Sequence, residues 1–246
     1  MYLLAFMFFL TSCASIHMDM AGSKSLSPEV QGHIKGSYNI SAGQTTRMEL
    51  DTSNGEVTNP LKSEHGESIS LANIELGLFD IVDFVYLSGG DSVGQFGVKV
   101  KIFGPSRPMA KAGDSSLSLY VGGGKDSEDD VDEAFVFSTA KADIEAKVMS
   151  AGLLYGHRIS NQTIIGTSLF YDSYNFNGKF TESFMTPLIG KEFDYDGKVF
   201  TLAIYTIFYS RSGWFTRLEA GVQQADWSHT DKVTMGLGSF AFGASF

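Results

Sequence analysis

Apolar and polar side chains alternate along most of the chain after residue 30, and this period of two constrains the fold more than any other feature. Within residues 214–224, Leu218 and Val222 occupy even positions, whereas Arg217 and Glu219 occupy odd positions. Successive side chains of a β-strand point to opposite faces, so such a segment carries its apolar residues on one face. No long stretch after residue 30 has helical spacing. The sequence therefore predicts an all-β fold.

The alternating segments number about ten and are separated by connections of very different length. The candidate strands are residues 33–50, 68–79, 81–88, 92–104, 114–123, 141–158, 162–174, 197–210, 213–226 and 232–246. The first segment has the weakest pattern, so eight or twelve strands remain possible.

Two of the segments change the face that carries their apolar residues. In the sixth segment Ile144 and Val148 are even, whereas Leu153 and Tyr155 are odd, and residues 232–246 change in the same way. A one-residue β-bulge exchanges the two faces of a strand. We therefore expect a bulge in each of these strands.

Four features favour a membrane barrel over a soluble sandwich. Many segments reach the roughly 9 to 11 residues that a tilted strand needs to cross lipid. Their polar face is rich in charge and glycine, and aromatic residues gather near their ends, as in membrane barrels. Long connections (51–67, 124–140, 175–196) alternate with short ones (near 80, 159–161, 211–212). The sequence predicts an antiparallel up-and-down transmembrane β-barrel with its long loops at one end.

The N-terminus has the length and composition of a targeting segment. Residues 3–10 are apolar, and this run is too short for a membrane-spanning helix of about 20 residues but fits the core of a signal peptide. Leu10-Thr11-Ser12-Cys13 resembles the lipobox of bacterial lipoproteins, which implies lipidation of Cys13 and cleavage before it. The start Met1-Tyr2-Leu3 lacks the usual Lys or Arg, so an ordinary secretory signal is the alternative.

The C-terminal segment ends in Phe246, with Phe240 and Phe242 on the same face. This ending resembles the C-terminal β-signal of bacterial outer-membrane β-barrel proteins. The resemblance implies the outer membrane of a Gram-negative bacterium, and it implies the barrel assembly machinery, membrane lipid and lipopolysaccharide as partners. We accordingly expect a signal peptide at 1–12, a periplasmic segment at 13–32 and the barrel at 33–246.

The inferred inner face of the barrel carries ten charged side chains, five acidic and five basic. They are Glu75, Asp83, Lys99, Lys101, Asp143, Glu145, Lys147, Arg158, Arg217 and Glu219. Opposite charges in a narrow interior pair with one another, and open diffusion pores usually need about 16 strands. The leading hypothesis is a narrow or plugged lumen with a structural or small-pore role.

Composition excludes some functions. The formal net charge is -10, which disfavours nucleic acid because phosphate binding needs clustered Lys and Arg. A single cysteine cannot form an internal disulfide, and no motif for a cofactor or a metal is found. The acidic run 126–133 lacks the EF-hand pattern, so a solvated loop is expected there and Ca²⁺ binding is the alternative.

Two further hypotheses concern an enzyme and an adhesin. His157 and Ser160 loosely resemble the His-x-Ser-Asn arrangement of outer-membrane lipid hydrolases, but their spacing of three places them on opposite faces of a strand. We therefore predict no enzyme activity, and a lipid hydrolase is the remote alternative. Aromatic residues in loop 175–196 either contact a partner surface or pack into the barrel mouth, so surface adhesion is the competing role. Oligomeric state is left open.

Overall fold

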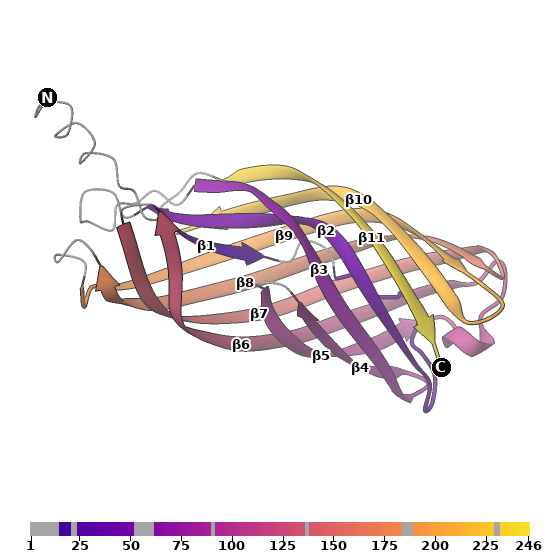
Figure 1. The fold of residues 1–246 in the computed structure, drawn as a ribbon. Coiled ribbons are helices and arrows are strands. Elements are labelled where there is room, and N and C mark those ends of the chain that lie inside the picture. Colours follow the sequence, from indigo (N-terminus) through magenta and orange to yellow (C-terminus); the bar gives the residue numbers. More distant parts are fainter. Residues whose placement is uncertain are drawn as a thin grey trace, which may run out of the picture.

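The computed structural model describes residues 15–20, 24–51, 62–89, 92–135, 138–183, 189–228 and 232–246, and they consist almost entirely of β-strand (Figure 1). The strands are β1 (Ser15–Met20), β2 (Gly36–Asp51), β3 (Lys62–Phe79), β4 (Val82–Gly89), β5 (Ser92–Phe103), β6 (Ser115–Phe135), β7 (Ser138–Ser160), β8 (Thr163–Ser183), β9 (Glu192–Tyr209), β10 (Trp214–Trp227) and β11 (Val233–Ser245). One 3-10 helix, η3 (Arg107–Met109), interrupts the connection between β5 and β6. Among the described residues, no helix has the length and apolar character needed to cross a membrane.

Ten strands close into a barrel. Sequential strands from β2 to β11 pair antiparallel, and β2 completes the ring by pairing with both β3 and β11. The additional strand β1 pairs with the second half of β2, from Thr46 to Asp51. The predicted closed, antiparallel, up-and-down barrel of about ten strands is confirmed.

The two ends of the barrel differ. One end, here called the turn end, contains the connections at 80–81, 104–114, 161–162 and 210–213 and the final residue of β11. The opposite end, here called the hairpin end, contains the other ends of the barrel strands and lies at the left in Figure 1. The predicted strand positions agree closely with the structure, but the strands extend farther toward the hairpin end than the sequence analysis indicated.

Two of the three connections predicted as long loops are mostly strand. Residues 124–140 belong to the β6–β7 hairpin, whose strands run to Phe135 and resume at Ser138, and most of 175–196 belongs to β8 and β9. Residues 52–61, within the third, lie outside the described residues. The sequence analysis ended these strands where their outward residues became polar, although the backbone pairing continues.

Buried and exposed side chains alternate along all 18 residues of β9, but the residue types on the two faces change partway along the strand. Toward the turn end the exposed residues are apolar, as at Phe200 and Ile204, and toward the hairpin end they are charged, as at Asp194 and Lys198. At ~3.3 Å per residue, β9 is far longer than the roughly 9 to 11 residues that cross lipid. The barrel therefore has one half with an apolar outside and one half with a polar outside.

The two predicted β-bulges are wrong, and the change along the outer face accounts for the exchange of apolar positions that they were meant to explain. In β7 every even residue from Ala142 to Arg158 faces inward, and the pairing with β6 and β8 has no shift near residue 150. In β11, Met235 and Leu237 face inward, and the register with β10 is continuous. The apolar side of each strand changes because the outer face of the barrel changes between polar and apolar, while the alternation of inward and outward positions continues.

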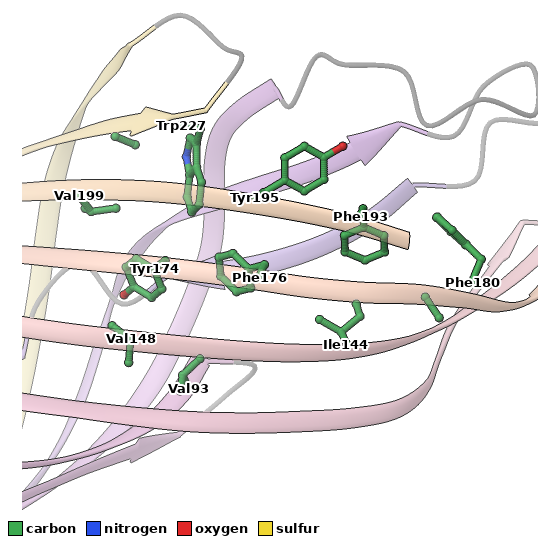
Figure 2. Close-up of a cluster of buried hydrophobic side chains, with 12 residues drawn as sticks. Val93, Ile144, Val148, Tyr174, Phe176, Phe180, Phe193, Tyr195, Val199 and Trp227 are labelled. Carbon is green, nitrogen blue, oxygen red and sulfur yellow. The ribbon is translucent and has the colours of Figure 1, made fainter. Parts of the chain in front are cut away.

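Inside the hairpin half, apolar side chains fill the barrel (Figure 2). Strands β7, β8, β9 and β10 contribute most of them, and the rings of Tyr174, Phe176 and Trp227 lie within 6.3 Å of one another between centroids. The cluster consists of Val93, Ala142, Ile144, Val148, Tyr174, Phe176, Phe180, Phe193, Tyr195, Val199, Ala225 and Trp227. This half has an apolar inside and a polar outside, as a water-exposed β-barrel does.

The turn-end half has the opposite arrangement. Its outer face is a belt of exposed apolar side chains that follows the whole ring of strands. The belt includes Tyr38, Ile40, Ile74, Leu76, Phe96, Val98, Val100, Leu119, Val121, Leu153, Tyr155, Ile165, Tyr171, Phe200, Leu202, Ile204, Phe208, Trp214, Leu218, Val222, Phe240 and Phe242. A continuous apolar surface of this extent needs a nonaqueous environment, and the inside of this half is correspondingly polar.

Candidate functional site

Residues 24–31 lie inside the barrel lumen and are nearly inaccessible to solvent, as at Leu26 and Val30, which are both 0% exposed. The segment enters after β1, whose Ser15 pairs with Asp51 at the hairpin end. It ends beside Arg107 at the turn end, where Arg107 N donates to the Val30 carbonyl over 2.8 Å. We call residues 24–31 the lumen segment.

Lys99 on β5 is the central contact of the lumen segment. Its ammonium forms ion pairs with Glu75 and with Asp83, the latter at 2.9 Å. It also donates to the carbonyl oxygens of Ser27 and Glu29, at 3.0 and 2.9 Å. Lys99 is fully buried, so these four acceptors replace the hydration that its charge loses.

The two carboxylates that pair with Lys99 also hold the segment's backbone. Ser27 N donates to Glu75 over 3.1 Å, and Gln31 N donates to both oxygens of Asp83 over 2.9 and 3.0 Å. Charge-assisted bonds of this kind are stronger than neutral ones. Side chains from β3, β4 and β5 therefore fix the position of the lumen segment along the barrel axis.

Arg158 on β7 binds the segment from another side of the ring. Its guanidinium contacts both oxygens of Glu29, at 2.6 and 2.7 Å, and donates to the Asn161 carbonyl at 2.6 Å. Planar two-point pairing of Arg with a carboxylate is strongly directional. The pair joins residues 129 positions apart in the sequence and closes the lumen near the turn end.

At the other end of the lumen segment, Lys24 reaches Asp172 on β8. The Lys24 Nζ to Asp172 Oδ1 distance is 3.0 Å, and Ser150 Oγ donates to the same carboxylate over 2.5 Å. Gln95 on β5 accepts from Lys24 over 3.3 Å, and its Oε1 lies 2.8 Å from Ser150 Oγ. Lys24 is thus held by two strands, β5 and β8, and Ser150 of β7 contacts the same two partner side chains.

Between these polar anchors the segment packs against apolar residues and small residues. Leu26 belongs to a buried cluster with Val85, Leu87, Tyr120, Leu154 and Phe170, and its carbonyl accepts from Arg217 on β10. Glycines leave room for the backbone, because a Cβ at Gly77 would collide with the Gly32 carbonyl and one at Gly156 would lie 2.6 Å from Pro28 Cγ. The segment therefore fits the inner wall along its length.

Chemically, this arrangement places paired charges inside the barrel. Four basic and five acidic side chains are buried in the lumen among the described residues: Lys24, Lys99, Arg158, Arg217, Glu29, Glu75, Asp83, Asp172 and Glu219. Buried ions that lose a partner are costly, so the set holds the segment in one position.

Sequence analysis placed ten charges on the inner face, and the structure divides them. Six are buried in the lumen: Glu75, Asp83, Lys99, Arg158, Arg217 and Glu219. Lys101 shares the face of Lys99 and is partly exposed near the turn end. Asp143, Glu145 and Lys147 instead face outward, because the register of β7 has no shift near residue 150. Lys24, Glu29 and Asp172 were missed.

The outward-facing Glu145 lies in the water-exposed half between two lysines. Its carboxylate pairs with Lys125 at 2.7 Å and with Lys147 at 2.6 Å. Hydrogen bonds from Lys125 and then Lys147 lower the pKa of Glu145 to about 2. The outer face of β7 therefore stays charged in this half of the barrel.

The prediction of a periplasmic segment at 13–32 differs from the structure, in which residues 24–31 occupy the lumen. The sequence analysis placed no strand here, although Leu26, Pro28 and Val30 alternate with polar residues over this short stretch. The predicted signal peptide 1–12 and the lipidation site Cys13 lie outside the described residues. The predicted assembly-signal residues Phe240, Phe242 and Phe246 are exposed on the outer face.

The candidate catalytic pair is not assembled. His157 Nδ1 lies 3.0 Å from Ser115 Oγ, its direct cross-strand neighbour on β6, and not beside Ser160. Tyr155 also donates to Ser115 over 3.4 Å. Among the described contacts, no carboxylate orients the ring of His157. A histidine that serves as a base is usually oriented by a third group, and that part is missing here.

The remaining motifs from the sequence also have defined positions. Asp126 and Ser127 of the acidic run lie on the exposed end of β6, while the side chains of 128–133 are outside the description. No group of acidic, His or Cys side chains suited to a metal ion occurs among the described residues. Four aromatics of 175–196, namely Phe176, Phe180, Phe193 and Tyr195, pack inside the barrel.

Comparison with known proteins gives only distant similarities. No family model matches the chain, and no curated protein matches it. A solved structure of Ail, the attachment invasion locus protein of Yersinia pestis, aligns over 87% of this chain and 99% of its own, with 12% identity and a TM-score of 0.35. The outer membrane protease OmpT from Escherichia coli aligns over 90% of this chain and 97% of its own, with 8% identity and a TM-score of 0.42. Similarities this low do not assign an activity.

Proposed function

We propose that the protein is an outer-membrane β-barrel closed by its own lumen segment, with a structural or surface-binding role and no solute-conducting pore. The observation that carries this proposal is the buried lumen segment, which contacts side chains of β2, β3, β4, β5, β6, β7, β8 and β10. A segment bonded to eight of the ten barrel strands narrows the lumen, which supports a barrel that conducts no solute.

The exposed apolar belt supports the membrane location. The belt surrounds the turn-end half, whose interior holds the buried charges, so lipid on the outside and polar groups on the inside are consistent with each other. Outer-membrane barrels generally have short turns on the periplasmic side. We therefore orient the turn end toward the periplasm and the hairpin end toward the cell surface, in contact with lipopolysaccharide.

The hairpin half supports a role at the surface. Its aromatic core makes it a stiff extension beyond the lipid, and its outer face carries the polar residues Asp143, Asn177 and Asp194. Such a platform can present the hairpin tips to a partner. Surface adhesion is accordingly the second candidate within this proposal.

Planar-bilayer recording tests the closed lumen. Purified protein is expected to show no steady conductance steps, whereas the variant Lys24→Ala/Glu29→Ala is expected to show transient openings because both side-chain ion pairs of the lumen segment are lost. The variant Lys179→Ala/Glu192→Ala removes an exposed ion pair in the hairpin half and serves as the matched control. Large, steady, nonselective steps from the unmodified protein would overturn the proposal.

Surface binding requires a separate measurement. Replacing the β8–β9 tip at residues 184–191 by a short Gly-Ser turn is expected to reduce adhesion of cells to a ligand-coated surface while leaving conductance unchanged. Unchanged adhesion to every surface that the unmodified cells bind would limit the protein to a structural role.

A further inference from the structure

A cavity of about 510 Å³ lies at the turn end, beneath the lumen segment. Four basic side chains line it, and Asp and Glu are absent from its described lining. The basic residues are Lys35, Arg107, Arg158 and Arg211. In a chain of formal net charge -10, four converging cations without an Asp or Glu in the described lining are unexpected from composition.

Three of these cations have no carboxylate partner among the described residues. Arg158 is neutralised by Glu29, but Lys35, Arg107 and Arg211 form no ion pair in that part of the chain. Lys35 and Arg211 are exposed at the rim. Their positive charge is therefore available to a ligand.

The guanidinium of Arg107 is already held in place by other residues of the chain. It lies over the ring of Tyr209, 4.1 Å from the centroid, and its Nη1 donates to Gln31 Oε1 over 3.1 Å. Stacking and one hydrogen bond fix the plane of the group and leave donors unused. Because Gln31 Oε1 accepts from Arg107, the unpartnered Nε2 of the buried Gln31 is a further donor at this site.

The cavity also touches the lipid-facing surface. Phe246 lines it and is 63% exposed, on the same outer face as Phe240 and Phe242. A lipid whose acyl chains lie along these rings can place its headgroup in the cavity. Converging Arg and Lys donors suit a phosphate group, which accepts several charge-assisted hydrogen bonds at once.

We propose that the turn-end cavity binds the phosphate group of a phospholipid through Lys35, Arg107 and Arg211. Only the lipid source of the phosphate rests on the proposed membrane location. The site itself depends on the local geometry, and a free phosphate ester would use the same donors.

Binding is tested with short-chain phosphatidylglycerol and with inorganic phosphate, each added to the detergent-solubilised full-length protein and followed by native mass spectrometry. The double variant Lys35→Gln/Arg211→Gln removes two rim charges, and Lys111→Gln/Lys198→Gln removes two exposed charges outside the cavity as the control. Heat-modifiable gel mobility verifies that every variant is folded.

We expect the unmodified protein and the control to bind phosphatidylglycerol alike, and the cavity variant to bind it about tenfold or more weakly, because charge-assisted hydrogen bonds are lost. Weaker binding of inorganic phosphate than of the lipid would assign the source to lipid, and equal binding would assign it to a soluble phosphate. No binding of either probe, or an equal loss in the control, would overturn the site. Neither result depends on conductance, so the closed-barrel proposal is judged separately.

Discussion

The ion pair between Glu29 and Arg158 gives the sharpest energetic prediction for the lumen segment. Both side chains are buried, and their two contacts measure 2.6 and 2.7 Å. Removing one partner of a buried pair leaves the other charge without compensation, which typically costs about 3–5 kcal/mol. We expect Arg158→Gln and Glu29→Gln each to lower the free energy of unfolding by an amount in this range.

The double variant Glu29→Gln/Arg158→Gln leaves no unpaired charge, so its loss is expected to be smaller than the sum of the single losses. Coupling energies of close charge pairs at interfaces are about 1.5–7 kcal/mol, and we expect at least ~2 kcal/mol here because both groups are removed from water. Urea unfolding in lipid vesicles, followed by tryptophan fluorescence, supplies the four free energies of the cycle.

The exposed pair Lys179–Glu192 provides the matched cycle. Its atoms are 3.6 Å apart and its side chains are 55% and 76% exposed, so coupling of about 0–1 kcal/mol is expected. A coupling between Glu29 and Arg158 no larger than that of the exposed pair would refute the placement of the lumen segment among the buried charges.

Three further predictions follow from the packing and the topology. Phe176→Ala is expected to cost about 3–5 kcal/mol in urea unfolding because it empties part of the hairpin-half core, whereas Asn177→Ala on the outer face should cost little; equal losses would contradict the inward position of Phe176. Gly77→Ala should destabilise the folded barrel on heat-modifiable gels because its Cβ would meet the Gly32 backbone, while Gly236→Ala, which meets nothing within 4 Å, should be tolerated. An epitope placed directly before Ser15 should be reached by antibody on intact cells, since β1 begins at the hairpin end; detection only after permeabilisation would reverse the orientation.

Much of the barrel could be predicted from the sequence because strand period is a local property. Alternation located the ten barrel strands, and in β10 it assigned Arg217 and Glu219 inward and Leu218 and Val222 outward, as the structure shows. The wrong assignments of inward and outward residues within the strands have one origin. Apolar residues were assumed to face outward throughout, but Ile144 and Val148 face inward in the half of the barrel whose outside is polar.

The lumen segment could not be predicted in the same way. Its eight residues alternate polar and apolar side chains only briefly, with Pro28 in the middle, and its position depends on side chains far away in the sequence, such as Lys99 and Arg158. A signal was nevertheless present. Balanced inward charges predict that something polar fills the interior, although they do not reveal that the filler is the chain itself.

Cysteine accessibility tests the filled lumen most directly. In a protein with Cys13→Ser, single cysteines at Leu26→Cys and Lys35→Cys are treated with a small maleimide in folded, lipid-embedded barrels and again after unfolding. Because Leu26 is 0% exposed and Lys35 is exposed at the turn end, we expect position 35 to react at once and position 26 to react only after unfolding. Equal rates at both positions in the folded barrel would show that the lumen is not occupied by residues 24–31.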